Sequence, residues 1–138
     1  MIWLQENISL VLFIIVFLIL SLRVPILARL LKVEQITTHE LNRQLGSTNP
    51  PVLMDVRTPG EFNSGHIDKA VSIPLSELHL RLTGLIQQYP NREIAVICRT
   101  GNRSLTASIS LKRAGFPHVF NVIGGLMHWQ SQGYPVRK

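Results

Sequence analysis

The only cysteine of the chain lies at the boundary between an apolar segment and a basic, polar one. Ile94–Ile97 are all apolar, and Cys98 is followed by the polar stretch Arg99–Ser104. A short apolar run of this kind is typical of a strand buried on both faces, as in a parallel sheet covered by helices. We therefore expect Cys98 at the carboxyl end of a central strand, where ligands bind in open α/β sheets.

The residues after the cysteine favour a thiolate nucleophile in an anion-binding loop. Apolar positions from Leu105 to Leu111 predict a helix that begins near Ser104, so loop N–H groups and the helix N-terminus should converge on the sulfur. Such a site favours negative charge, lowers the pKa of the thiol and holds an anionic substrate beside the thiolate. The candidate substrate-binding loop consists of Arg99, Thr100, Gly101, Asn102, Arg103 and Ser104.

Strands and helices that position this loop alternate along the rest of the chain. Capping-box patterns at Thr37–Glu40 and Thr58–Glu61 predict two short helices. Further strands are expected at Val52–Val56, Ala70–Ile73 and Val119–Val122, and further helices over Leu78–Ile86, Ser104–Ala114 and Leu126–Gln132. This alternation predicts an α/β fold with parallel strands and right-handed crossovers.

The amino-terminal segment has the composition of a membrane span. Ile8–Leu22 contains fifteen residues, all aliphatic or aromatic except two serines. A helix of this length covers roughly 22 Å of a hydrocarbon core about 30 Å thick, so Trp3, Leu4 and Val24–Leu31 must extend it. We expect residues 1–32 to form an uncleaved transmembrane anchor and a juxtamembrane segment, with a bend at Pro25.

A cleaved signal peptide is the main alternative for this segment. It requires a positively charged start and small residues at the cleavage site, whereas the first 22 residues contain no Lys or Arg. Arg23, Arg29 and Lys32 follow the apolar run, so the positive-inside rule places the carboxyl-terminal domain, residues 33–138, in the cytoplasm. The single cysteine excludes a disulfide within the chain and agrees with a reducing compartment.

Charge and residue spacing exclude several other classes of partner. The formal net charge of +6 is spread without a basic block, and no aromatic residues are interleaved with basic ones, so we expect no nucleic-acid partner. The histidines have no metal-ligand spacing with one another or with Cys98, so no metal and no cofactor are expected.

Four separate stretches of the chain carry a recognisable pattern: Asp55–Phe62, Gly65–Pro74, Cys98–Ser104 and Gly124–Val136. Together, and in the same order, they resemble the rhodanese family of sulfurtransferases. The resemblance covers about residues 33–138 and implies a three-layer α/β fold, with a central parallel sheet of about five strands and helices on both faces, here preceded by one transmembrane helix. Lys69 departs from the family, which usually has a small residue, often glycine, at this turn.

The resemblance also implies a mechanism. The thiolate of Cys98 would attack the outer sulfur of a small anionic donor such as thiosulfate, and the resulting persulfide would pass its sulfur to cyanide or to a thiol, including one on a partner protein. One of Arg99 and Arg103 would face the donor, and the other would brace the loop against Asp55 or Glu61. Asp55, Arg57 and Glu61 are expected to support the loop from behind.

Two other functions remain open. A cysteine-dependent phosphatase or arsenate reductase places its arginine six positions after the cysteine, where this chain has Ser104; Arg103 comes one position earlier. The tighter loop suits a single sulfur better than a tetrahedral phosphate. A non-catalytic interaction module at the membrane would be expected to lack Cys98 or Gly101, and both are present. We expect His66 and Trp129 to have structural roles.

Overall fold

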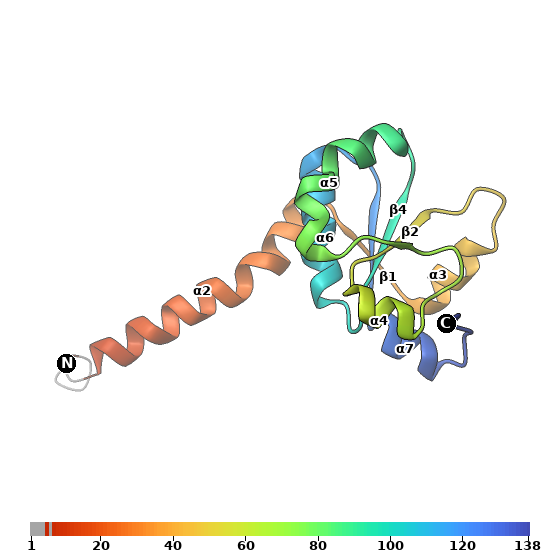
Figure 1. Cartoon of the computed structure of the whole chain (residues 1–138). Coiled ribbons are helices and arrows are strands. Elements are labelled where there is room, and N and C mark those ends of the chain that lie inside the picture. Colours follow the sequence, from red (N-terminus) through yellow and green to blue (C-terminus); the bar gives the residue numbers. More distant parts are fainter. Residues whose placement is uncertain (1–4, 6) are drawn as a thin grey trace.

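The sheet has five parallel strands, and its order explains where the cysteine lies. A computed structural model describes residue 5 and residues 7–138 (Figure 1). The strands lie in the order β1-β5-β4-β2-β3. Their bounds are Glu34–Ile36 for β1, Val52–Asp55 for β2, Val71–Ser72 for β3, Ile94–Ile97 for β4 and Val119–Val122 for β5. All neighbouring pairs are parallel, so the predicted α/β class is confirmed and β4 is the central strand.

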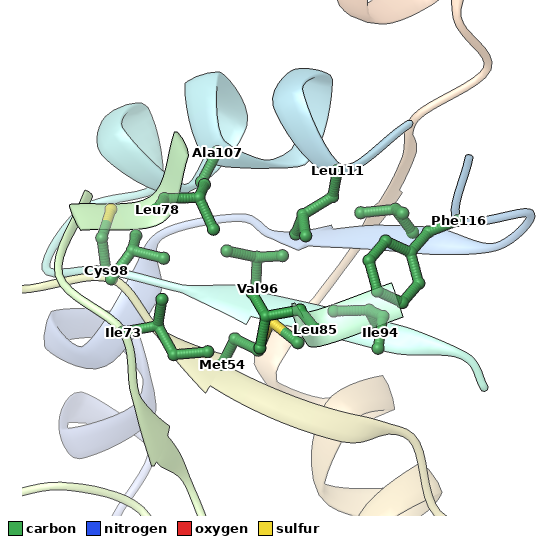
Figure 2. Packing of buried hydrophobic residues seen from close by; sticks show 12 residues of the cluster. Met54, Ile73, Leu78, Leu85, Ile94, Val96, Cys98, Ala107, Leu111 and Phe116 are labelled. Atoms are coloured by element: carbon green, nitrogen blue, oxygen red, sulfur yellow. The ribbon is translucent and has the colours of Figure 1, made fainter. Parts of the chain in front are cut away.

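Helices cover both faces of this sheet. Their bounds are Thr38–Leu45 for α3, Pro59–Ser64 for α4, Leu75–Gln88 for α5, Asn102–Ala114 for α6 and Gly125–Ser131 for α7. Alternate strand residues point to opposite faces. Val96 packs with α5 and α6 in one core (Figure 2), whereas Ala95 and Ile97 pack with α3 and α7 in the other. The three-layer arrangement is therefore confirmed.

The first strand has no counterpart among the strands predicted from sequence. In β1 only Ile36 is buried, and Glu34 and Gln35 are exposed. The strand pairs with β5 at the edge of the sheet. Two polar residues out of three leave no apolar run, so β1 is held by tertiary pairing rather than by a strong local signal.

Both predicted capping-box patterns start helices where expected, but only the one at Thr58 forms the reciprocal pair of hydrogen bonds. The Thr58 hydroxyl accepts a hydrogen bond from the Glu61 N–H, and the Glu61 carboxylate accepts one from the Thr58 N–H at 3.0 Å, with Pro59 at the first helical position. Thr37 Oγ1 likewise accepts from the Glu40 N–H at 3.1 Å. By contrast, α6 begins at Asn102, two residues before the expected start at Ser104. Arg103 therefore lies in the first turn of the helix and not in the loop before it.

The long amino-terminal helix α2 runs from Ile8 to Leu30 without interruption at Pro25. By length and composition it could cross a membrane, and no part of its most apolar window is buried. The juxtamembrane segment, expected after a bend, is therefore the last part of the same helix; a proline removes one backbone hydrogen bond, and the neighbouring turns keep theirs. Trp3 and Leu4, which were expected to extend the span, lie outside the described residues.

The carboxyl-terminal end of α2 is fixed to the domain. Lys32 adopts a left-handed conformation with φ of 56°, and the Val33 N–H donates to the Ala28 carbonyl at 2.9 Å. This is the hydrogen-bond pattern of a Schellman motif. Ala28 and Val33 are buried against Ile109 of α6. The helix thus joins the sheet through a packed turn.

Candidate active site

The sulfur of Cys98 lies at the carboxyl end of β4, inside the turn that leads to α6. The Gly101 N–H donates to Sγ at 3.1 Å. The thiol donates to Ser104 Oγ at 3.3 Å, and after ionisation the hydroxyl can donate to the thiolate instead. Cys98 is 1% exposed and Ser104 is fully buried, so these bonds form away from bulk water.

The surroundings of the sulfur lower the pKa of the thiol. Burial raises the pKa of Cys98, because it disfavours the charged form. The Ser104 hydroxyl and the backbone amides of Ser104, Gly101 and Thr100 act in the opposite direction and outweigh burial, so the pKa lies below its ordinary value. The convergence of loop amides and the first turn of α6 on the sulfur therefore favours the nucleophilic thiolate.

Glycines allow the turn to close around the sulfur. Gly101 has φ of 105°, and a Cβ atom there would lie 3.3 Å from the Val122 carbonyl oxygen. Gly125 has φ of 56°, and its Cβ would lie only 2.5 Å from the Cys98 carbonyl oxygen. This close approach lets the Leu126 and Met127 N–H groups donate to the carbonyls of Cys98 and Arg99 at 2.8 and 3.0 Å. The first turn of α7 thus holds the loop carbonyls away from the sulfur.

The two loop arginines have different surroundings. Arg103 forms a bidentate ion pair with Glu61, with both N–O distances 2.8 Å. Hydrogen bonding to Arg103 lowers the pKa of Glu61 from 4.5 to about 2, although burial acts in the opposite direction. Of the alternatives left open by the sequence, Arg103 therefore braces the loop, and it does so against Glu61 and not Asp55.

Asp55 has a different partner. Arg57 donates to both Asp55 carboxylate oxygens, with Nη2–Oδ2 at 2.7 Å, and also to the Gly65 carbonyl at 2.8 Å and the Glu61 carbonyl at 3.2 Å. Asp55 is 1% and Arg57 5% exposed. A buried charge needs such a partner. The pair ties the end of β2 to α4, which carries Glu61.

Arg99 faces an open cavity beside the loop. Across the described residues its guanidinium takes part in no ion pair and no hydrogen bond, and the side chain is exposed. The cavity has a volume of about 530 Å³ and is lined by Arg57, Gly60, Glu61, Ser64, Gly65, Arg99, Leu126, Met127 and Gln130. Thr100 and Asn102 are exposed on the loop, whereas Gly101 is buried beneath it.

The remaining candidates have structural positions. The His66 ring stacks on Phe62 with centroids 3.8 Å apart, and Trp129 is 2% exposed in the core with its Nε1 donating to the Pro135 carbonyl. Within the described part of the chain, no group of three or more His, Cys, Asp or Glu residues could hold a metal ion. Sequence reasoning missed Asn121, which donates to the Gly101 carbonyl at 3.4 Å and to Gln35 at 2.8 Å. A polar residue inside an otherwise apolar strand was the available signal.

Comparison with known proteins decides the family. Residues 37–132 match the family model described as "Rhodanese-like domain". The chain belongs to the rhodanese-like sulfurtransferase family. Its membership confirms the resemblance seen in the four stretches and supports sulfur transfer as the general activity.

Individual relatives agree with this assignment. The rhodanese-like chain is 31% identical over 104 residues to a sulfurtransferase of Allochromatium vinosum, covering 75% of this chain and 94% of that protein. It is 33% identical over 100 residues to a putative sulfur carrier protein of Bacillus subtilis, covering 72% of this chain but 52% of that protein. A crystal structure of a rhodanese-related protein from Thermoplasma volcanium superposes with a TM-score of 0.66 and 34% identity, covering 75% of this chain and 97% of that one.

Proposed function

We propose that the rhodanese-like domain transfers sulfane sulfur from a thiosulfate-like donor to a thiol or cyanide, with Cys98 as the persulfide carrier. The observation that carries the proposal is the pair of hydrogen-bond partners of Sγ, the Gly101 N–H at 3.1 Å and the Ser104 hydroxyl at 3.3 Å, both of which can donate once the thiol is ionised. They stabilise a thiolate before reaction and a persulfide anion after it. The family membership supports the same chemistry.

The proposed reaction has two steps. In the first, the Cys98 thiolate attacks the outer sulfur of thiosulfate; a new S–S bond forms, the bond to the sulfonate sulfur breaks, and sulfite leaves with the electron pair. In the second, cyanide or an acceptor thiolate attacks the outer sulfur of the persulfide, giving thiocyanate or a new persulfide and regenerating the Cys98 thiolate. No external oxidant or reductant is required.

Arg99 is the residue that we propose to bind the donor. Arg99 lines the cavity, while Arg103 is occupied by Glu61 at 2.8 Å. An unpaired guanidinium beside the loop suits the sulfonate oxygens of thiosulfate and the departing sulfite. Arg99→Gln should raise KM for thiosulfate several-fold, while the pKa of Cys98 should change little, because the Arg99 side chain makes no bond to the sulfur.

Sulfur loading tests the proposal directly. The full chain, purified in detergent, is incubated with thiosulfate and examined by intact mass spectrometry, with Cys98→Ser as the matched control. We expect a gain of one sulfur atom that cyanide removes as thiocyanate and that the variant does not acquire. Failure to load, or loading that survives Cys98→Ser, would reject the proposal. If the protein instead hydrolyses an aryl phosphate, and Cys98→Ser abolishes this hydrolysis, the alternative function of a cysteine-dependent phosphatase is supported.

We further propose that residues 1–32 anchor the domain, residues 33–138, to the cytoplasmic side of a membrane. Support comes from the exposed apolar helix α2 and from the cationic residues Arg23, Arg29 and Lys32 after its apolar run. The protein should remain in membranes after alkaline carbonate extraction, and a fluorescent protein fused after Lys138 should fluoresce. Release by carbonate, or a mature chain that starts after Arg23, would contradict the anchor.

A further inference from the structure

A groove lies between the end of α2 and the outer side of α6. It has a volume of about 380 Å³, and it is lined by Arg23, Val24 and Leu27 from α2 and by Thr106, Ser110 and Arg113, with Ile109 below, from α6. The packed cluster of Ala28, Val33 and Ile109 fixes the two helices against each other beside this groove. The groove is therefore a property of the docked helix pair and not of either helix alone.

The groove carries two cations without counterions. Arg23 and Arg113 are both exposed, and among the residues that the structure describes neither forms an ion pair or a hydrogen bond. The lining contains no acidic residue, and it includes Thr106 and Ser110, of which the Ser110 hydroxyl donates to the Thr106 carbonyl at 3.4 Å. Two guanidinium groups that line one groove are suited to the oxygens of a phosphate group.

A second hollow on the surface of α2 shares Arg23 with the groove. It has a volume of about 380 Å³, a wholly apolar lining except for Arg23, and is formed by Ile15, Leu18, Ile19, Leu22, Arg23 and Ile26. Arg23 lines both hollows and directly follows the apolar run. A ligand that fills both must have an anionic head and an apolar tail.

We infer that this pair of hollows binds one anionic phospholipid, with its phosphodiester between Arg23 and Arg113 and an acyl chain along Ile15–Leu22 of α2. The inference rests on the proposed membrane anchor, in which Arg23 lies at the level of the cytoplasmic headgroups. Basic sites of this kind at the membrane surface select anionic headgroups. The lipid would hold the domain in one orientation, because it contacts both the anchor and α6.

Lipid binding to the full chain tests this inference. Native mass spectrometry in detergent micelles follows the titration of dioleoylphosphatidylglycerol and, separately, dioleoylphosphatidylcholine. The double variant Arg23→Gln/Arg113→Gln is compared with Arg81→Gln/Lys138→Gln, which removes the same charge from exposed positions outside the groove. We expect one phosphatidylglycerol to be retained, and its affinity to fall about thirtyfold in the groove variant only, equivalent to about 2 kcal/mol at 1.4 kcal/mol per tenfold.

Three results would overturn the inference. Equal retention of phosphatidylcholine would show that the phosphate site does not select an anionic lipid. An equal loss of affinity for phosphatidylglycerol in the two double variants would show a general effect of surface charge. Displacement of the lipid by millimolar inorganic phosphate would assign the arginines to a free anion. Sulfur loading at Cys98 is measured on the same detergent samples, and carbonate extraction is measured on the membranes from which each variant is purified. A loss of lipid binding is therefore distinguishable from a failure of the enzyme or of the anchor.

Discussion

Replacing Ser104 by alanine should make the Cys98 thiol harder to ionise. The Ser104 hydroxyl lies 3.3 Å from Sγ and is the largest of the hydrogen-bond contributions that lower the pKa of Cys98. A hydrogen bond to a charged group is worth about 1.5–3 kcal/mol. The hydroxyl also accepts a hydrogen bond from the neutral thiol, so it stabilises both protonation states. Its net stabilisation of the thiolate relative to the thiol therefore falls near the lower end of this range. At about 1.5 kcal/mol, the thiolate fraction drops roughly tenfold at a pH below the pKa of both proteins.

The ultraviolet absorbance of the thiolate measures this change. The chain has a single cysteine, so the titration reports Cys98 alone once the baseline of Cys98→Ser is subtracted. The midpoint should move to higher pH in Ser104→Ala. Sulfur loading at a fixed pH below that midpoint should slow by roughly threefold, because a thiolate of higher pKa is more nucleophilic and offsets part of the lost thiolate fraction.

Ser108→Ala is the matched control. Ser108 is a fully buried serine one turn further along α6, and its hydroxyl donates to the Ser104 carbonyl at 2.7 Å, not to the sulfur. An unchanged midpoint in Ser104→Ala, or an equal shift in Ser108→Ala, would refute the role given to the Ser104 hydroxyl.

Three further substitutions test the contacts that hold the Cys98 loop, at Glu61 and Gly125, and the turn at Lys69. Glu61→Gln keeps a capping side chain but removes the charge that pairs with Arg103. The pKa of Glu61 falls from 4.5 to about 2 in the folded protein. The ion pair therefore stabilises the fold above pH 4.5, and this stabilisation is lost as the pH falls toward 2. Both side chains are about one-third exposed (30% and 36%), so solvent screening reduces this to about 1 kcal/mol, seen as a lower Tm at neutral pH that converges with the native chain near pH 2. Lys69→Gly should raise the free energy of unfolding by about 0.5–1 kcal/mol, because Lys69 has φ of 63° and glycine adopts this conformation without strain; a lower Tm would contradict this. Gly125→Ala should cost more than about 3 kcal/mol and abolish sulfur loading, because its Cβ would lie 2.5 Å from the Cys98 carbonyl oxygen, whereas Gly84→Ala, with no atom within 4 Å, should leave the Tm equal or higher.

Local signals were sufficient for the elements that carry the cysteine. The apolar run Ile94–Ile97 predicted a central strand, and the Thr58–Glu61 capping box predicted the helix that presents Glu61; both are present. The thiol pKa moves in the expected direction because loop amides reach the sulfur. These features depend on residues close together in sequence.

Contacts between distant segments could not be predicted in the same way. The roles of Arg99 and Arg103 depend on the start of α6 at Asn102, which places Arg103 in the first turn, within reach of Glu61 on α4. The close approach of Gly125 to the Cys98 carbonyl requires α7 to fold back onto the loop. Neither packing arrangement has a signature in the local sequence.

Together with the proposed anchor, the packed turn at Lys32 limits how far Cys98 can travel. Only Leu31–Val33 separate α2 from β1, and the Val33 N–H bond to Ala28 fixes the direction of the chain there. A flexible linker would let the sulfur sample a wide volume and meet partners at many heights. With this junction and the proposed anchor, the search is confined to a thin layer beside the bilayer. An acceptor thiol held in the same membrane at matching height would meet the persulfide at high effective concentration, whereas one held at another height would rarely meet it.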